Sequence, residues 1–123
     1  MIRLIEFSFL KGRNMLQQIN GKHDLDAAGN PAGGKTTGKG IEIDWQNGPL
    51  GRGTERKEPN GAFVEGVIAA AIDRINFYQE GNGGKFKCRE NALAITKLEE
   101  ALLWLQKRTM DREARAVEGT HTA

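Results

Sequence analysis

The sequence has little cysteine, little net charge and no long apolar run. Its single cysteine, Cys88, excludes an internal disulfide framework and is typical of a reducing cytosol. The 18 Lys and Arg residues against 16 Asp and Glu residues leave a formal charge of +2, mixed along the chain. This argues against a general DNA or RNA coat, which shows a concentrated basic patch. No apolar stretch approaches the roughly 20 residues of a membrane span, so we expect no membrane segment.

The first residues contain a short apolar run without the small-residue cleavage site of a signal peptide. Within it, Phe7 and Phe9 alternate with Glu6 and Ser8. Alternation of apolar and polar residues favours a strand. We therefore expect a strand and no secretion signal here.

The 123 residues suffice for one small domain, and their composition changes near residue 60. The first part, 1–59, is polar and glycine-rich, and it holds all three prolines. In its clearest strand, Ile41, Ile43 and Trp45 alternate with polar residues. The pattern predicts a small antiparallel sheet with strands at about 2–10, 14–19 and 40–46, and glycine-rich loops at 27–40 and 51–58.

From residue 60 to about 110 the apolar period becomes helical. Ile68, Ile72 and Ile75 lie on one face of a helix that ends at the glycines of 81–84, and a second helix is predicted from about Cys88 to Thr109. Two long helices joined by a short turn form an antiparallel hairpin. The fold class predicted is therefore α+β, with a small sheet followed by a two-helix hairpin and a tail at 111–123.

The hairpin carries more apolar surface than two helices can cover by themselves. Leu103 and Trp104 lie outside the main apolar stripe of the second helix. Because symmetric pairing is the commonest way to cover such a surface, we expect a homo-oligomer. The tail from Arg112 onward, taken on composition alone, is typical of a frayed terminus.

One segment matches a phosphate-binding loop in its letters only. Residues 29–36 fit G-x-x-x-x-G-K-[ST]. Such a loop follows a buried strand and opens a helix whose amides hold the phosphate. Here polar residues precede the segment, and residues 37–40 lead into a strand instead of a helix. We interpret the match as chance.

Catalytic groups are sparse, and the sequence predicts no enzyme, no metal site and no cofactor. His23 and His121 have no metal-ligand spacing with Cys88, and nothing resembles a nucleophile with its base. Binding groups are better supplied, because a nucleotide needs aromatic surface together with fixed donors. Each candidate for such a nucleotide site is also consistent with a core residue or a surface charge. The candidates are Trp45, Asn47, Arg52, Phe77, Tyr78, Phe86, Arg89, Glu90, Asn91 and Arg108.

Several runs of the chain resemble the Thoeris anti-defence 1 family of phage proteins. Together they cover roughly residues 15–123, and the chain is similar, more distantly, to the anti-CBASS 2 sponges. The longest run begins Phe86-Lys87-Cys88-Arg89-Glu90-Asn91 and continues through residue 102. The other runs are residues 43–49, 60–65, 112–115 and 117–121.

The resemblance implies a sponge that acts in the cytoplasm of the infected bacterial host. Family members hold intact a cyclic ADP-ribose variant made by bacterial TIR-domain proteins, so that the Thoeris effector is never triggered. Some also capture cyclic di- and trinucleotides of CBASS defence at a separate site. The resemblance further implies dimers that assemble into a hexamer, with ligands at subunit interfaces.

Residue roles are likewise implied by the resemblance. Tyr78 or Phe77 would stack on adenine, Asn91 would bond ribose or base, and Arg108 would meet phosphate. Arg52, with Arg56 as its substitute, would close the pocket beside Trp45 and Asn47. The cyclic trinucleotide site would use Arg115, Thr120 and His121, which implies an ordered tail. Two alternatives stay open: an enzyme that degrades the same signal, and a phage structural protein without a nucleotide ligand.

Overall fold

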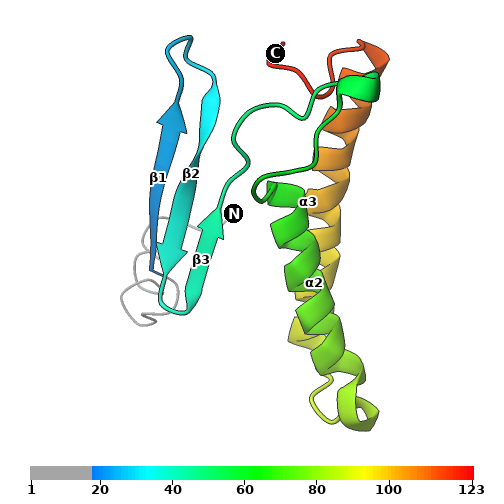
Figure 1. Cartoon of the computed structure of the whole chain (residues 1–123). Helices are drawn as coiled ribbons and strands as arrows, with labels where there is room; N and C mark the ends of the chain where they lie inside the picture. The colour runs from blue at the N-terminus through cyan, green and yellow to red at the C-terminus, as the bar shows by residue number, and fades with distance from the viewer. Residues whose placement is uncertain (1–17) are drawn as a thin grey trace, which may run out of the picture. The chain divides into compact units, whose positions relative to one another are not determined.

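The computed structural model describes residues 18–123, as a three-stranded sheet followed by two helices (Figure 1). The α+β class and the helical hairpin predicted from the sequence are confirmed. The strand expected at 2–10 lies outside the described residues, as do residues 14–17 of the next one. The chain divides into two compact units, a sheet unit and a helical unit.

The sheet unit contains strands β1 (Ile19–Leu25), β2 (Pro31–Gly38) and β3 (Ile41–Asp44). They pair antiparallel in the order β1-β2-β3, with Lys22 opposite Lys35 and Lys35 opposite Asp44. The amine of Lys35 lies 2.6 Å from a carboxylate oxygen of Glu42 on β3. The Lys35 amine also bonds the Asp44 carboxylate, and the hydrogen bonds to Glu42 and Asp44 raise the pKa of Lys35.

Strand β2 corrects the glycine-rich loop predicted at 27–40. Its residues have no apolar alternation, so the sequence pattern contains no strand signal. It is a strand because it pairs through its backbone with a neighbour on each side. Gly34 has a φ of +133°, and a β-carbon there would lie 2.4 Å from the carbonyl oxygen of Lys22. Close backbone approach therefore requires glycine at this position.

The helical unit contains α2 (Val64–Glu80) and α3 (Arg89–Ala114), which pack against each other as the predicted hairpin. Helix α2 begins four residues later than predicted, because Asn60, Gly61 and Ala62 bond the segment after β3 instead. The Ala62 amide donates to Asp44, and the Gln46 side-chain oxygen accepts from the Asn60 amide. Short 3-10 turns lie at η2 (Gly53–Glu55) and η3 (Gly81–Gly84).

Helix α3 runs five residues beyond the predicted end at Thr109. It closes with two backbone bonds typical of a Schellman motif, from Val117 to the Arg112 carbonyl and from Ala116 to the Glu113 carbonyl. Ala116 has a φ of +57°, in the left-handed region that such an end requires. The usual glycine is absent at this position, so no residue type there signals the end of the helix.

Among residues 18–123, none is fully buried within one chain. The apolar faces of α2 and α3 meet along the hairpin, where Ile72, Ile95 and Leu98 are half-buried. In contrast, Leu103, Trp104 and Met110 on α3 are 64–66% exposed. Among the described residues, no helix is long and apolar enough to cross a membrane.

Candidate functional site

The turn end of the hairpin presents an aromatic pair. The rings of Phe77 and Tyr78 lie with their centroids 5.9 Å apart and their planes inclined by 57°. Both are in the last turns of α2, and they are 56% and 40% exposed. The guanidinium carbon of Arg74 lies 4.8 Å from the Phe77 centroid and 5.1 Å from the Tyr78 centroid. This arrangement offers flat apolar surface to a ligand, with one cation against it.

Asn91 lies in the first turn of α3, at the same end of the hairpin. Its amide donates to the Cys88 sulfur, and its side-chain nitrogen lies 3.4 Å from the Phe86 carbonyl oxygen. Gln79 of α2 fixes this segment through two bonds with the Cys88 backbone, of 2.9 and 3.1 Å. The thiol of Cys88 therefore caps a helix, and Asn91 is held in place for its side-chain oxygen to accept a bond.

The other end of α3 contains a hollow of about 450 Å³ rich in cations. Lys107 in this hollow is paired with Asp111 at 2.8 Å. Arg112 and Arg115 donate to backbone oxygens of the tail. Among the described residues, Arg108 makes no hydrogen bond or ion pair and so remains open to an anion. The lining residues are Trp104, Lys107, Arg108, Asp111, Arg112, Arg115 and Ala123.

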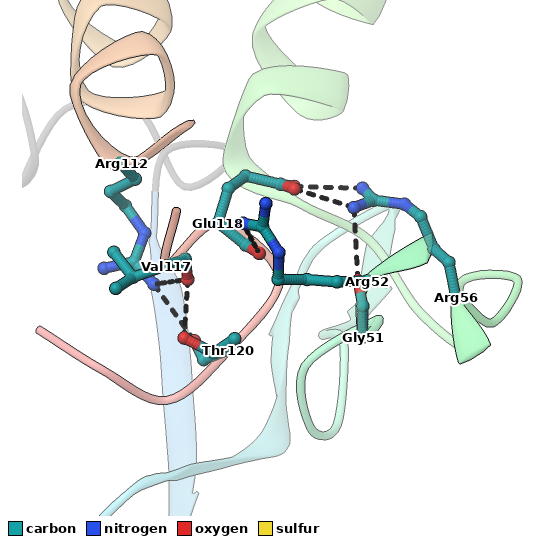
Figure 2. A network of polar contacts seen from close by, with 7 residues as sticks. All are labelled: Gly51, Arg52, Arg56, Arg112, Val117, Glu118 and Thr120. Carbon is teal, nitrogen blue, oxygen red and sulfur yellow. Dashed lines mark hydrogen bonds and ion pairs between the residues drawn. The ribbon is translucent and has the colours of Figure 1, made fainter. Parts of the chain in front are cut away.

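The tail is tied to the loop that precedes α2, by contacts drawn in Figure 2. Both terminal nitrogens of Arg56 donate hydrogen bonds to the Glu118 carboxylate, at 2.7 and 3.0 Å. Arg52 donates to the Glu118 carbonyl at 3.2 Å, and the Gly51 amide donates to the Gly119 carbonyl at 2.9 Å. The bond from Arg56 is the main reason that the pKa of Glu118 is lowered and that of Arg56 raised.

Arg112 fastens the same tail to the end of α3. Its guanidinium donates to the carbonyls of Val117, Thr120 and Thr122 (Figure 2 shows the first two). The Thr120 hydroxyl donates to the Val117 carbonyl. The tail is therefore folded back and bonded, unlike the frayed terminus that its composition alone predicts. We call the contacts of Arg52, Arg56 and Arg112 with the tail the tail clasp.

The sheet unit holds two further candidates. The Trp45 indole nitrogen donates to the Thr36 hydroxyl at 2.6 Å, which attaches the half-buried ring to β2. The Asn47 backbone exchanges two bonds with the Asn60 side chain, at 2.8 and 3.0 Å. These contacts stabilise the segment after β3 and leave the Asn47 side chain exposed.

The structure groups the predicted residues into separate clusters. Phe77, Tyr78 and Asn91 belong to the turn end, whereas Arg108 and Arg115 line one hollow at the other end. Arg52 and Arg56, both offered for closing a pocket, bond Glu118 of the tail. Thr120 bonds within the tail, and His121 is exposed.

Sequence reasoning missed Arg74, Arg112 and Glu118. Arg74 had a usable signal, since it precedes Phe77 and Tyr78 by three and four residues on one helix. Arg112 and Glu118 had none, because their partners are set by how the tail folds. Within residues 18–123, no group of three His, Cys, Asp or Glu residues is placed to hold a metal ion.

A small antiparallel sheet, followed along the chain by a two-helix hairpin, is the class of protein that these units define. Residues 38–110 match the family model described as Acb2/Tad1, hairpin domain. The chain is also 51% identical over 84 residues to "Thoeris anti-defense 1" of Bacillus phage SBSphiJ7. These matched residues make up 68% of this chain. The chain therefore belongs to the Acb2/Tad1 family. The match spans 54% of that relative, about half its length.

Proposed function

We propose that the protein is an anti-defence sponge, which binds cyclic ADP-ribose variants made by bacterial TIR proteins and holds them uncleaved. The observation that carries the proposal is the unpaired Arg108 in a cationic hollow, on a hairpin whose other end presents the exposed rings of Phe77 and Tyr78. A guanidinium suits a phosphate, and a ring face suits a base. Membership of the Acb2/Tad1 family supports the same ligand class.

The ligand site requires a second copy of the chain. Asn91 and Arg108 lie on one straight helix 17 residues apart, which at 1.5 Å per residue separates them by about 25 Å. A single cyclic dinucleotide-sized ligand is too small to touch both. If two hairpins pair antiparallel, the Asn91 end of one protomer meets the Arg108 end of its partner. The proposed site therefore lies at a subunit interface and occurs twice in a symmetric dimer.

The exposed apolar side chains of α3 support such pairing. Leu103, Trp104 and Met110 are each 64–66% exposed in the single chain. Covering them with a second copy removes apolar surface from water, which favours association. We propose that these dimers assemble further into a homohexamer.

A second ligand class is proposed for the tail. Cyclic di- and trinucleotides of CBASS would be bound by Arg115, Thr120 and His121. Arg112 donates to the Thr120 carbonyl and Arg115 donates to a backbone oxygen of Ala123 at 2.8 Å, so the tail is ordered before any ligand arrives. A segment ordered in advance loses less entropy on binding.

Release of the intact ligand is the test of this function. The purified protein is incubated with the TIR-derived cyclic ADP-ribose, filtered, heated, and both fractions are analysed by chromatography. We expect the signal to leave the filtrate and return unchanged. A new species in the heated fraction would instead identify an enzyme that degrades the signal. A signal that never leaves the filtrate, with cyclic trinucleotides equally ignored, would favour a structural phage protein.

A further inference from the structure

Helix α2 has a single cationic side chain, and it lies on the only aromatic rings of that helix. Arg74 contacts Phe77 and Tyr78 at 4.8 and 5.1 Å from their ring centroids, and its Nε donates to the Tyr78 hydroxyl oxygen at 3.2 Å. The guanidinium thus covers part of the ring surface that the proposed function assigns to a base.

The charge of Arg74 is weakly satisfied. Within residues 18–123 it forms no ion pair, whereas the guanidinium of Arg56 holds a carboxylate with two bonds of 2.7 and 3.0 Å. A cation over exposed rings is held less strongly than a cation bonded to a carboxylate or phosphate. A phosphate that comes within reach is therefore a better partner for Arg74 than the rings are.

A nucleotide brings both groups that this arrangement can exchange. Its base is flat and stacks on aromatic faces, and its phosphate accepts bonds from a guanidinium. If the base takes the ring surface, the displaced guanidinium gains the phosphate as its partner. A nucleoside also displaces the guanidinium, but it offers no anion in return.

We propose that Arg74 makes the aromatic pair selective for nucleotides over nucleosides, by leaving the rings of Phe77 and Tyr78 to the base and moving onto the ligand phosphate. The inference rests on the proposed function, because it takes these rings as the base-stacking surface. Arg74 acts in two opposite ways: it competes with the base for the rings and it attracts the phosphate.

Two ligands separate these effects in the 123-residue chain. Binding of cyclic ADP-ribose is measured by calorimetry, and binding of adenosine by an NMR titration that reaches millimolar concentrations. For Arg74→Ala we expect roughly tenfold weaker binding of cyclic ADP-ribose, from loss of a charged hydrogen bond. We expect about two- to fivefold tighter binding of adenosine, because the cation–π contact no longer competes. Arg74→Lys should lie between wild type and Arg74→Ala for cyclic ADP-ribose.

Opposite signs for the two ligands support the proposal. A change in the same direction for both would show that Arg74 only supports the rings, and no change for either would place it outside the site. Both results overturn the proposal while leaving the sponge function intact, since wild type still binds cyclic ADP-ribose. If wild type binds neither cyclic ADP-ribose nor the TIR-derived variant, the proposed function itself fails, and the role of Arg74 with it.

The Nε–Hε signal of Arg74 gives a readout independent of affinity. It is identified as the signal lost in Arg74→Lys, and the ring currents of Phe77 and Tyr78 shift it in the free protein. Saturation with cyclic ADP-ribose should remove that ring-current shift as the guanidinium leaves the rings. A signal that stays in place with the ligand bound would overturn the proposed exchange.

Discussion

The two ends of the α2–α3 hairpin carry different chemistry and are held together in different ways. At the turn end, Arg74 and Tyr78 are bonded partners 4 residues apart on one helix. At the tail end, Arg56 and Glu118 are partners 62 residues apart in the chain. The first arrangement forms whenever the helix forms, whereas the second requires the tail to return to the loop before α2. The contacts at the turn end are therefore local and form with the helix, whereas the contacts at the tail end are conditional on the fold of the tail.

This difference matters for the proposed site, because antiparallel pairing of two chains joins one end of each kind. The rings and Asn91 of one protomer would face Arg108 of the other, near its tail clasp. Damage to either end should then reduce binding, but only damage to the tail clasp should also loosen the structure of the chain.

The largest expected effect is on binding, through Arg108. In Arg108→Ala, capture of the TIR-derived cyclic ADP-ribose should weaken roughly 10- to 100-fold, because a charged hydrogen bond to phosphate is lost. Since Arg108 has no partner within the described chain, thermal stability should stay unchanged. Calorimetry and thermal unfolding measure the two quantities. The matched control is Lys97→Ala, a 76% exposed cation of the same helix. Equal affinity of Arg108→Ala and Lys97→Ala would contradict the assignment.

Next in size is the loss of tail order when Arg112 is removed. Arg112→Ala deletes donors to three tail carbonyls, and we expect the local opening free energy of the tail to fall by about 2 kcal/mol. Hydrogen exchange of the Thr120 amide, which donates to Val117, reports this opening. The amide of Asn91 at the turn end should exchange as in wild type.

The control for this variant is Lys107→Ala, which removes an exposed pair with Asp111 from the same end of α3. Exposed pairs contribute little, so its effect on Thr120 exchange should be small. If the two variants open the tail equally, general damage to the helix end explains the loss, and the specific bonds of Arg112 do not.

What the sequence could foresee follows the same division between local and distant contacts. The apolar spacing of Ile68, Ile72 and Ile75 identified α2, and alternation at Ile41 and Ile43 identified β3. Strand β2 was missed because neighbouring strands, and no pattern of its own, hold Pro31–Gly38 extended. A propensity signal cannot show pairing that depends on residues elsewhere in the chain.

The candidate site divides in this way too. Phe77, Tyr78 and Asn91 were expected near the hairpin turn, and the helices that place them there follow from sequence periodicity. Arg52 and Arg56 were expected to close a ligand pocket, a role that stays a prediction beside their bonds to Glu118. Those bonds join positions more than 60 residues apart, and no spacing rule connects them.

The two ends of the hairpin also differ in the residue that occupies the left-handed region of the backbone. Ala116 closes α3 at the tail end with φ +57°, and Asn82 turns the hairpin with φ +50°. Asparagine tolerates this region, whereas alanine is strained there. Ala116→Gly should therefore raise the free energy of unfolding by about 0.5–1 kcal/mol, net of the added freedom of the unfolded chain. Asn82→Gly should change it little. Denaturant unfolding checks both, and equal effects would refute the difference in strain.

The smallest expected effect is a pH dependence confined to the tail end. The hydrogen bond from Arg56, with help from the charges of Arg52 and Arg112, holds the pKa of Glu118 below its ordinary value. A carboxyl whose pKa is lowered by folding stabilises the folded form above its unfolded pKa, of about 4.3, and loses that contribution as pH falls through the folded pKa. The clasp should therefore be closed at neutral pH and should weaken in acid, as the pH falls through the lowered pKa of Glu118.

The Gly51 amide reports this transition, since it donates to the Gly119 carbonyl beside Glu118. Its NMR shift should titrate in the acid range in wild type, and the Asn91 amide at the turn end serves as the reference. In Glu118→Gln the acid transition at Gly51 should disappear, because the side chain no longer titrates. The free-energy change will be modest, since the Arg56 and Glu118 side chains are 42% and 22% exposed and water screens the pair. If the same transition persists in Glu118→Gln, another carboxyl causes it. The ion pair between Arg56 and Glu118 would then not be the contact on which the order of the tail end depends.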